Sequence, residues 1–194
     1  MSTSKTLRII DTNVIIEPGK VPDQISSIEE LECAIQCTRF LNELIHNPDS
    51  GIVLDHGREI LNEYEQVINR QRSKHGFNFA TTTAFMNWLY PYFAKRFCHE
   101  NNVELVDLQK TGENEYAVFP ADPALDGFDP PDKKFIAAAC AHPEHPPVVE
   151  GTDCKWLKYR DALSGHGVRI EFLCPAYIRA NYRHKFPGEE PPEW

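Results

Sequence analysis

The sequence lacks any apolar run that approaches the roughly 20 residues needed to cross a bilayer. Its first ten residues, MSTSKTLRII, are polar and then enter a short strand-like run. This is not the pattern of a secretory signal peptide, which has a longer apolar centre. These absences predict a cytoplasmic protein without membrane contact.

No Cys-x-x-Cys pair occurs, although the chain has six cysteines: Cys33, Cys37, Cys98, Cys140, Cys154 and Cys174. Zinc frameworks and disulfide scaffolds show cysteines at characteristic spacings. Here the first two lie within a single helix-like run, and the others are scattered. The pattern therefore predicts reduced thiols in the core.

Positive charge is scarce, and the formal net charge is −9. Such a balance argues against nucleic-acid binding. The objection weakens if acidic residues surround a divalent cation, because the bound ion reverses the sign of the local field. The chain has 194 residues, of which 41% are hydrophobic and 25% charged, as expected for one compact soluble domain.

Short apolar strands alternate with amphipathic helices along the chain. We expect strands at 7–10, 52–54, 103–106, 147–150 and 168–173. Helices are expected at 28–45, 57–72, 81–97, 131–141, 154–164 and from 175, with Pro91 kinking or splitting the third. The Gly-, Pro- and acid-rich stretch 109–129 is predicted to be irregular.

This order of elements predicts an α/β fold, a three-layer sandwich. Its central parallel sheet would have about five strands, with helices on both faces. The sequence shows no internal repeat and no linker. We therefore expect a single domain over residues 1–186, followed by a short flexible tail over 187–194.

Four acids fall where such a fold binds ligands, beyond the carboxyl ends of the strands. Asp11 closes the first strand, and Asp153 follows the fourth. Asp132 opens the helix that leads into the fourth strand, and Glu63 lies on the helix after the second. Clustered carboxylates repel one another unless they are protonated or hold a hard cation. Oxygen-only ligands favour Mg²⁺, Mn²⁺ or Ca²⁺ over zinc.

Each acid also has a purely structural explanation. Asp11 could close an Asx-turn, and Asp153 could cap the helix that follows it. Asp132 could be a first-turn acid of a helix capped by Asp129, and Glu63 a solvated helix residue. The ordered set of four, rather than any single acid, supports a shared site.

Five segments in this order resemble the PIN domain family of nucleases. They are IIDTNVII at 9–16, ILNEYEQV at 60–67, DPPDKKF at 129–135, GTD at 151–153 with Trp156 and Leu157, and the segment from Gly165 to Tyr177. The resemblance covers nearly the whole chain. It implies a PIN-like fold with the four acids as its metal site.

The resemblance also implies an activity: hydrolysis of single-stranded RNA with Mg²⁺ or Mn²⁺, giving a 5′-phosphate and a 3′-hydroxyl. Asp11 and Asp153 would be the main metal ligands, and the other two acids would bind directly or through water. Asn13 would hold Asp11 in position or orient the attacking water. Thr152 would donate a hydrogen bond to a carboxylate or a phosphate.

One position departs from the family pattern. Many PIN proteins carry a second Asp two residues after the last acid, where this chain has Lys155. The change predicts either a weakened second metal position or a degenerate, non-catalytic member. Asp55 and Asp161 are candidate substitutes for the missing acid.

Binding of the phosphate backbone calls for basic residues. Three groups are candidates: Arg70, Arg72, Lys74 and His75; Lys133 and Lys134; and Arg179, Arg183, His184 and Lys185. From these we expect four substrate contacts: Arg70, Arg72, Lys74 and Lys133. The alternative for each group is a solvated surface. His142 and His145 lack the further Cys or His that a transition-metal site would need.

The leading hypothesis is a Mg²⁺- or Mn²⁺-dependent endoribonuclease that serves as a toxin, a defence effector or an RNA-processing enzyme. A toxin would have an antitoxin or another regulatory protein as its partner, and a homodimer is compatible with the sequence. The alternative is a catalytically degenerate PIN-like module that binds RNA or a protein. A phosphatase of similar topology would need an Asp-x-Asp pair, which Thr12 and Asn13 do not supply.

Overall fold

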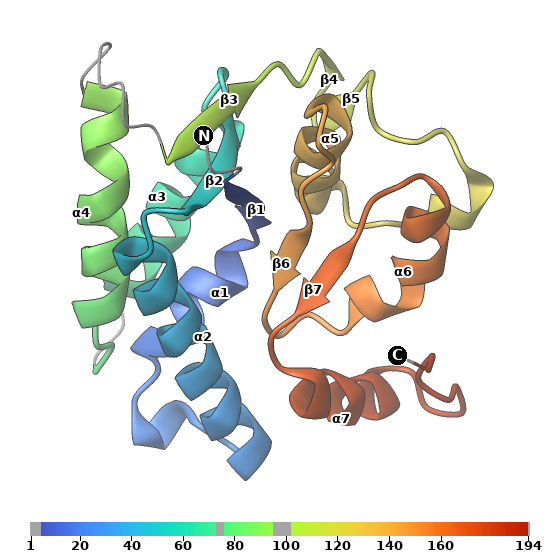
Figure 1. Ribbon diagram of the computed structural model, residues 1–194. Coiled ribbons are helices and arrows are strands. Elements are labelled where there is room, and N and C mark those ends of the chain that lie inside the picture. The colour runs from blue at the N-terminus through green and yellow to red at the C-terminus, as the bar shows by residue number, and fades with distance from the viewer. Residues whose placement is uncertain (1–4, 73–75, 95–101, 194) are drawn as a thin grey trace.

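The computed structural model describes residues 5–72, 76–94 and 102–193. Five strands form one parallel sheet in the order β3-β2-β1-β6-β7 (Figure 1). The strands are β1 Thr6–Ile10, β2 Ser50–Asp55, β3 Val103–Val106, β6 Val148–Glu150 and β7 Ile170–Phe172. The predicted five-stranded parallel sheet is confirmed.

The centre of the sheet is apolar because helices bury both of its faces. Ile9 and Ile10 of β1 are at most 1% exposed, and they pair in register with Val148 and Val149 of β6. All six residues of β2 are buried as well. Successive side chains of a strand point to opposite faces, so uninterrupted apolar runs suit a sheet covered on both sides.

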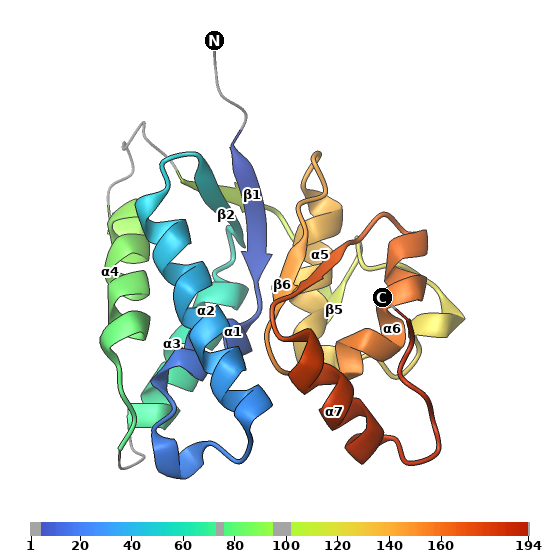
Figure 2. The same cartoon turned by 60° about the horizontal axis from the view of Figure 1, so that its bottom comes forward.

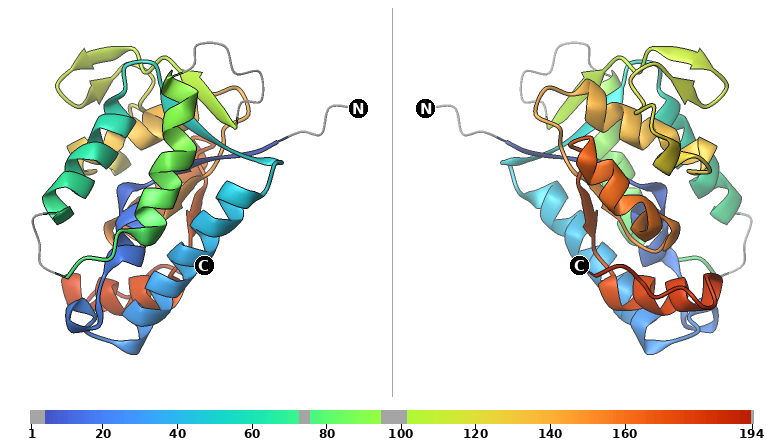
Figure 3. Two further views of the ribbon diagram at one scale, coloured as in Figure 1. Left: turned by 90° about the vertical axis from the view of Figure 1, so that its left-hand side faces the viewer. Right: turned by 90° about the vertical axis from the view of Figure 1, so that its right-hand side faces the viewer.

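Helices lie on both faces of the sheet, as predicted. They are α1 Thr12–Ile16, α2 Ile28–His46, α3 Glu59–Arg72, α4 Ala80–Ala94, α5 Lys133–Ala141, α6 Lys155–Gly165 and α7 Pro175–Lys185. The helices α3 and α5 contact one another on one face, and α2 covers the other face beside α4 and α7 (Figure 3). Within the described part of the chain, no helix is both long and apolar enough to span a membrane.

Pro91 does not split its helix, since α4 continues past it to Ala94. Pro91 has no backbone N–H, so it removes one hydrogen bond from α4. The described helix continues for only three residues after it, so few other hydrogen bonds depend on this one. The last three residues of the predicted helix, 95–97, lie outside the described residues.

The stretch 109–129 is more regular than predicted. It forms an antiparallel hairpin of β4 Lys110–Gly112 and β5 Glu115–Tyr116 (Figure 3). Tyr116 and Leu125 are 4% and 3% exposed, so they anchor the segment to the core. The prediction of a wholly irregular segment is wrong: Tyr116 anchors the hairpin itself, and Leu125 anchors the turn that follows it.

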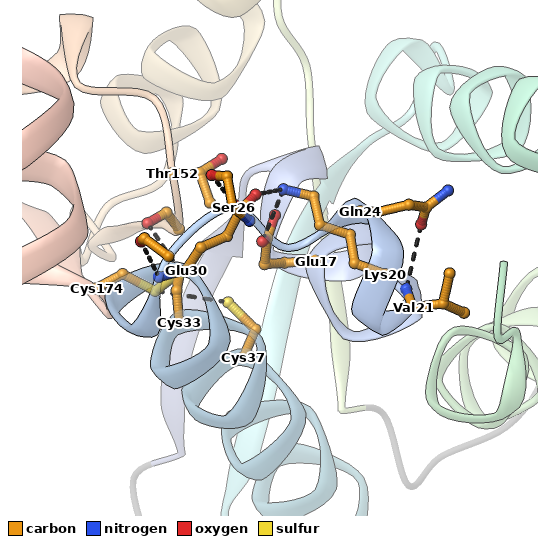
Figure 4. Close-up of polar contacts among 12 residues, drawn as sticks. Glu17, Lys20, Val21, Gln24, Ser26, Glu30, Cys33, Cys37, Thr152 and Cys174 are labelled. Carbon is orange, nitrogen blue, oxygen red and sulfur yellow. Dashed lines mark hydrogen bonds and ion pairs between the residues drawn. A yellow bond between two sulfur atoms is a disulfide. The ribbon is translucent and has the colours of Figure 1, made fainter. Parts of the chain in front are cut away.

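The prediction of reduced core thiols is wrong for one pair. Cys33 on α2 and Cys174, just before α7, form a disulfide with a Cα–Cα distance of 5.0 Å (Figure 4). The two residues are 141 positions apart, so no local spacing in the sequence predicts the pair. Cys37, Cys140 and Cys154 are free thiols.

The segment after α7 turns back onto that helix. The Arg179 guanidinium donates to the Pro192 carbonyl at 2.9 Å, and the Tyr182 hydroxyl donates to Glu189 Oε2 at 3.0 Å. These contacts place the tail against α7. Its predicted flexibility stays a prediction.

Candidate metal centre

The sheet has its topological switch point between β1 and β6. From β1 the chain moves outward to β2 and β3, and later to β6 and β7 on the other side. Open α/β sheets bind ligands at this point, beyond the carboxyl ends of the two central strands. Figure 2 shows β1 leading into α1 at this point. The residues that end the two strands are Ile10 and Glu150.

Asp11 follows β1 directly and is 2% exposed. It is the N-cap of α1, and its Oδ1 accepts a hydrogen bond from the Asn13 backbone N–H at 2.8 Å. Its own N–H donates to the Val149 carbonyl of β6 at 2.9 Å. The predicted positioning role of Asn13 is thus filled by its backbone, and Asp11 is fixed where the two central strands end.

Glu150, which the sequence analysis did not single out, ends β6 and is fully buried. Its Oε1 accepts the backbone N–H groups of Thr152 and Asp153, both at 2.8 Å. Its Oε2 has no hydrogen-bond donor among the described residues. A carboxylate oxygen buried in this way is stable only with a proton or a cation beside it.

Glu150 opposes the ionisation of Asp11, whereas a hydrogen bond with the Asp11 carboxyl lowers the pKa of Glu150 in part. Burial, then the charge of Glu150, raises the pKa of Asp11 well above its usual value. Burial, then the charge of Asp153, raises the pKa of Glu150 to about 7, although backbone donors lower it in part. When one of the two carboxyls is protonated, it can share its hydrogen with the other. A bound cation would allow both to ionise.

Three further acids form an outer group next to this inner pair. Asp129 precedes the 3₁₀ turn η4 Pro130–Asp132, and Asp153 follows β6. One carboxylate oxygen from each of Asp129, Asp132 and Asp153 lies within 4.8 Å of the others. Asp129 was expected to be a helix cap, but its side chain makes no capping hydrogen bond.

Asp132 links the outer group to the inner pair. Burial, then the charges of Asp11, Glu63 and Asp153, raises the pKa of its carboxyl to about 8. These acids come from four separate segments of the chain. The fold therefore brings the four predicted acids close enough to act on one another.

Glu63 already has partners on both of its carboxylate oxygens. Thr12 Oγ1 donates to Oε1 at 2.5 Å, and Lys134 forms an ion pair with Oε2. Lys134 is 5% exposed and also donates to the Pro131 carbonyl. Of the four predicted acids, Glu63 is the one that the protein itself neutralises, so its direct role as a metal ligand is the least supported.

Lysines also reach the outer group. Lys155 forms an ion pair with Asp129, and this contact raises the pKa of Lys155. Lys185 Nζ lies 3.6 Å from Asp153 Oδ1. The same Oδ1 accepts the Lys155 backbone N–H at 2.9 Å, so Asp153 also supports the first turn of α6. Lys155 thus lies beside the acids, and the carboxylate that it pairs with is Asp129.

The predicted substrate-binding residues are spread more widely. Arg70 and Arg72 are exposed on α3, while Lys74 and His75 lie outside the described residues. Lys133 forms an ion pair with Glu115 of the hairpin at 2.7 Å, and this contact engages its charge. Thr152 acts through its backbone N–H, which holds Glu150.

The candidate substitutes for the missing acid are engaged elsewhere. Asp55 accepts the backbone N–H groups of Glu59 and Ile60, so it caps α3. Asp161 is exposed and pairs with Arg160.

His142 and His145 do not form a metal pair. His142 Nε2 contacts Glu104 at 3.0 Å, and its Nδ1 accepts the Glu144 N–H at 3.2 Å. Both ring nitrogens of His142 are therefore engaged. The tautomer follows from these partners, because a nitrogen that accepts an N–H cannot carry a proton itself.

The donor set of the site consists of carboxylate oxygens. Hard divalent cations such as Mg²⁺ and Mn²⁺ prefer these ligands, and the unpartnered Glu150 oxygen marks where positive charge is missing. No family model, curated protein or solved structure matches the chain. The resemblance to PIN domains therefore stays a prediction.

Proposed function

We propose that the protein is a divalent-cation-dependent nuclease that hydrolyses phosphodiester bonds in single-stranded RNA. The observation that carries the proposal is the buried Glu150 carboxylate beside Asp11, with one oxygen to which no N–H group or side-chain hydroxyl of the described residues donates. Structural acids are normally hydrogen-bonded when buried. An acid pair left short of positive charge at a sheet switch point is suited to a ligand that supplies it.

Asp11, Glu150, Asp132 and Asp153 would hold Mg²⁺ or Mn²⁺. When bound, such an ion polarises a phosphoryl oxygen and lowers the pKa of water. Asp11 and Glu150 are kept in place by backbone N–H groups, so the ligands are ordered before the ion arrives. Without a cation, the Asp132 carboxyl holds a proton near neutral pH, and this proton must leave when the charge of the site is compensated.

The helix α3 offers a path for the RNA backbone away from the acids. Arg70 follows Glu63 by seven residues, so it lies on the same helix face about 10 Å further along the axis. Its side chain is exposed, as is that of Arg72. The Arg70 guanidinium is placed to bind a phosphate that flanks the one at the metal centre. Arg72 lies on the opposite side of the helix, 6.0 Å from the centre of the Phe79 ring.

A second candidate function has its own support. Lys134 and Lys155 form ion pairs with Glu63 and Asp129, and Lys185 approaches Asp153. These lysines supply part of the charge that metal ions would otherwise provide. A catalytically degenerate module that binds RNA or a protein would have this arrangement if the lysines replaced the metal altogether.

One experiment separates the two functions. Purified protein is incubated with end-labelled single-stranded RNA, with Mn²⁺ or Mg²⁺ and then with excess EDTA. A nuclease should cleave only with the cation, and Mn²⁺ should raise its melting temperature because the ion binds the folded state. RNA binding without cleavage, together with no thermal response to tens of millimolar Mn²⁺, would favour the degenerate module.

The matched variants are Asp11→Asn and Asp161→Asn. Both remove one carboxylate charge and keep the side-chain shape, but Asp161 is exposed and outside the site. Cleavage should be lost only in the Asp11 variant. Undiminished cleavage by a verified Asp11→Asn protein would end the proposal.

A further inference from the structure

Three cysteines from two helices meet beneath the acidic site. Cys33 and Cys37 lie one turn apart on the same face of α2. Cys174, which immediately precedes α7, bonds to Cys33, and its Sγ lies 3.9 Å from Cys37 Sγ (Figure 4). The three are 1%, 0% and 4% exposed, so they form one buried sulfur cluster.

The loop that carries the acids lies directly on this cluster. The Gly151 carbonyl oxygen is 3.5 Å from Cys33 Sγ, and a Cβ added to Gly151 would lie 3.4 Å from Cys37 Sγ. The next two residues, Thr152 and Asp153, donate the N–H groups that hold Glu150. The position of the sulfurs therefore sets the position of the turn that orders the inner acid.

The helix α7 provides a second connection. The disulfide fixes its first turn, while Lys185 in its last turn lies 3.6 Å from Asp153. Ile178 and Tyr182 of α7 pack with Leu157 of α6, the helix that follows the acidic loop. A change at the start of α7 is thus transmitted to both sides of Asp153.

The other partner, α2, is firmly anchored. Lys20 Nζ lies 2.6 Å from Glu30 and 2.9 Å from Glu17 (Figure 4). Ser26 also donates to Glu30 through its backbone and its hydroxyl. When the disulfide opens, the element free to move is therefore the start of α7 and not α2.

We propose that Cys33, Cys37 and Cys174 form a thiol–disulfide switch, in which the disulfide orders the loop 151–153 and with it the acidic site. A small dithiol opens it by exchange. One thiolate of the reductant attacks Cys174 or Cys33 and forms a mixed disulfide, and the second thiolate resolves it. The reductant leaves as a disulfide, and two electrons and two protons remain on the two cysteines.

The third thiol gives the switch a second closed form. Burial raises the pKa of the Cys37 thiol, so it is a poor nucleophile and leaves the Cys33–Cys174 bond intact. Once the cluster is reduced, reverse exchange with a small disulfide can join Cys174 to either cysteine of α2.

Hydrogen exchange of the wild-type protein tests the ordering step without any variant or activity. The amides of Thr152 and Asp153 are protected by Glu150, and reduction should speed their exchange by at least about 10-fold. Peptides from β3, at the opposite edge of the sheet from β7, serve as the internal control. Unchanged exchange of both amides after complete reduction, verified by thiol counting, would overturn the switch.

Cysteine variants then test which sulfurs take part in the switch. The Cys140→Ser protein should show the same amide hydrogen exchange at Thr152 and Asp153 as the wild type in both redox states, because Cys140 is a free thiol on α5. Cys33→Ser, oxidised with a small disulfide, should yield a Cys37–Cys174 bond by peptide mapping. Mapping that finds Cys37 and Cys174 as free thiols in that variant would refute the second closed form.

The effect on the metal centre rests on the proposed function, and calorimetry with Mn²⁺ examines it separately. The reduced protein should bind Mn²⁺ about 10-fold or more weakly, a loss typical of disturbed groups around a metal. Equal affinities in both states would refute the link to the metal. If neither state binds Mn²⁺, the proposed function fails, while hydrogen exchange still decides the switch.

Discussion

The inner and the outer acids of the site lie at one edge of the sheet but differ in how their charge is compensated. Asp11 and Glu150 are almost fully buried, and backbone N–H groups hold them. Among the described residues, no ion pair joins either acid to a lysine or an arginine. The inner pair therefore depends on a proton or an added cation.

The outer acids are more exposed, and two of them, Asp129 and Asp153, have a lysine beside them. Lys155 pairs with Asp129, both side chains being 37% exposed, and Lys185 approaches Asp153. Solvent screens such pairs, so each contributes little to stability. The acids therefore do not form one electrostatic unit. Under the proposed function, the buried members would decide whether a metal is needed, and the exposed members would adjust how tightly it is held.

The largest expected effect separates the two groups by activity. Asp11→Asn should lower RNA cleavage by more than about 100-fold, because even the loss of a group that only orients a metal ligand costs about 10- to 100-fold. Asp129→Asn should lower cleavage by only a few-fold, since Lys155 already occupies that carboxylate. Rates are measured on one RNA at saturating Mn²⁺. Equal losses of cleavage rate in both variants would show that the inner and outer acids do not differ in this way.

The next effect concerns stability without metal. Glu150→Gln removes a buried charge and supplies an N–H donor next to Asp11, which should stabilise the apo protein by about 1–2 kcal/mol. For a chain of this size, this raises the melting temperature by roughly 2–8 °C. Asp129→Asn should shift it by less than about 2 °C, as expected for an exposed pair. A destabilised Glu150→Gln protein would show that Glu150 is already satisfied.

The pH dependence of the apo protein follows from the same pair. The pKa of Glu150 is about 7 and that of Asp132 about 8, both above the ordinary values of carboxyls. Between about pH 4 and 8 the folded state therefore binds more protons than the unfolded chain, and stability should fall as pH rises. Melting temperatures from pH 5.5 to 8.5 should show this decline, reduced in Asp132→Asn. Saturating Mn²⁺ should flatten it, since the ion displaces the protons.

The smallest effect is that of Lys155→Asp. The substitution removes the cation beside Asp129 and adds an acid, so Mn²⁺ affinity should rise by about 3- to 10-fold and the apo protein should lose up to about 1 kcal/mol. Lys158→Asp is the matched control, because Lys158 lies on the same helix and pairs with Glu189 at 3.5 Å. Calorimetric titration compares the two. Equal affinities would mean that Lys155 does not influence the metal.

The sequence predicted the sheet well because its signal is local. Uninterrupted apolar runs such as Ile52–Leu54 mark strands covered on both faces, and the helices between them show a period of 3.6. The carboxyl ends of parallel strands share one edge, so the meeting of Asp11, Asp132 and Asp153 could be anticipated from the order of elements.

What the sequence did not predict depends on distant partners. Glu150 was included in an apolar strand, although an acid that ends a buried strand beside the switch point is itself a signal. Asp129 has the pattern of a helix cap, and only the fold shows it beside Lys155. The pairing of Cys33 with Cys174 has no local signature at all, because the α2–α7 contact creates it.

The central place of β1 has a consequence for synthesis of the chain. Asp11 leaves the ribosome early, while its sheet neighbour β6 begins at Val148, so at 5–20 residues per second roughly 7–30 s separate them. During this interval β1 can pair with β2 but has an open edge towards the absent β6, and open edges invite pairing with other chains. The inner acids come together only when that edge closes. A nascent chain is thus exposed to aggregation for the same interval in which its inner acids are still apart.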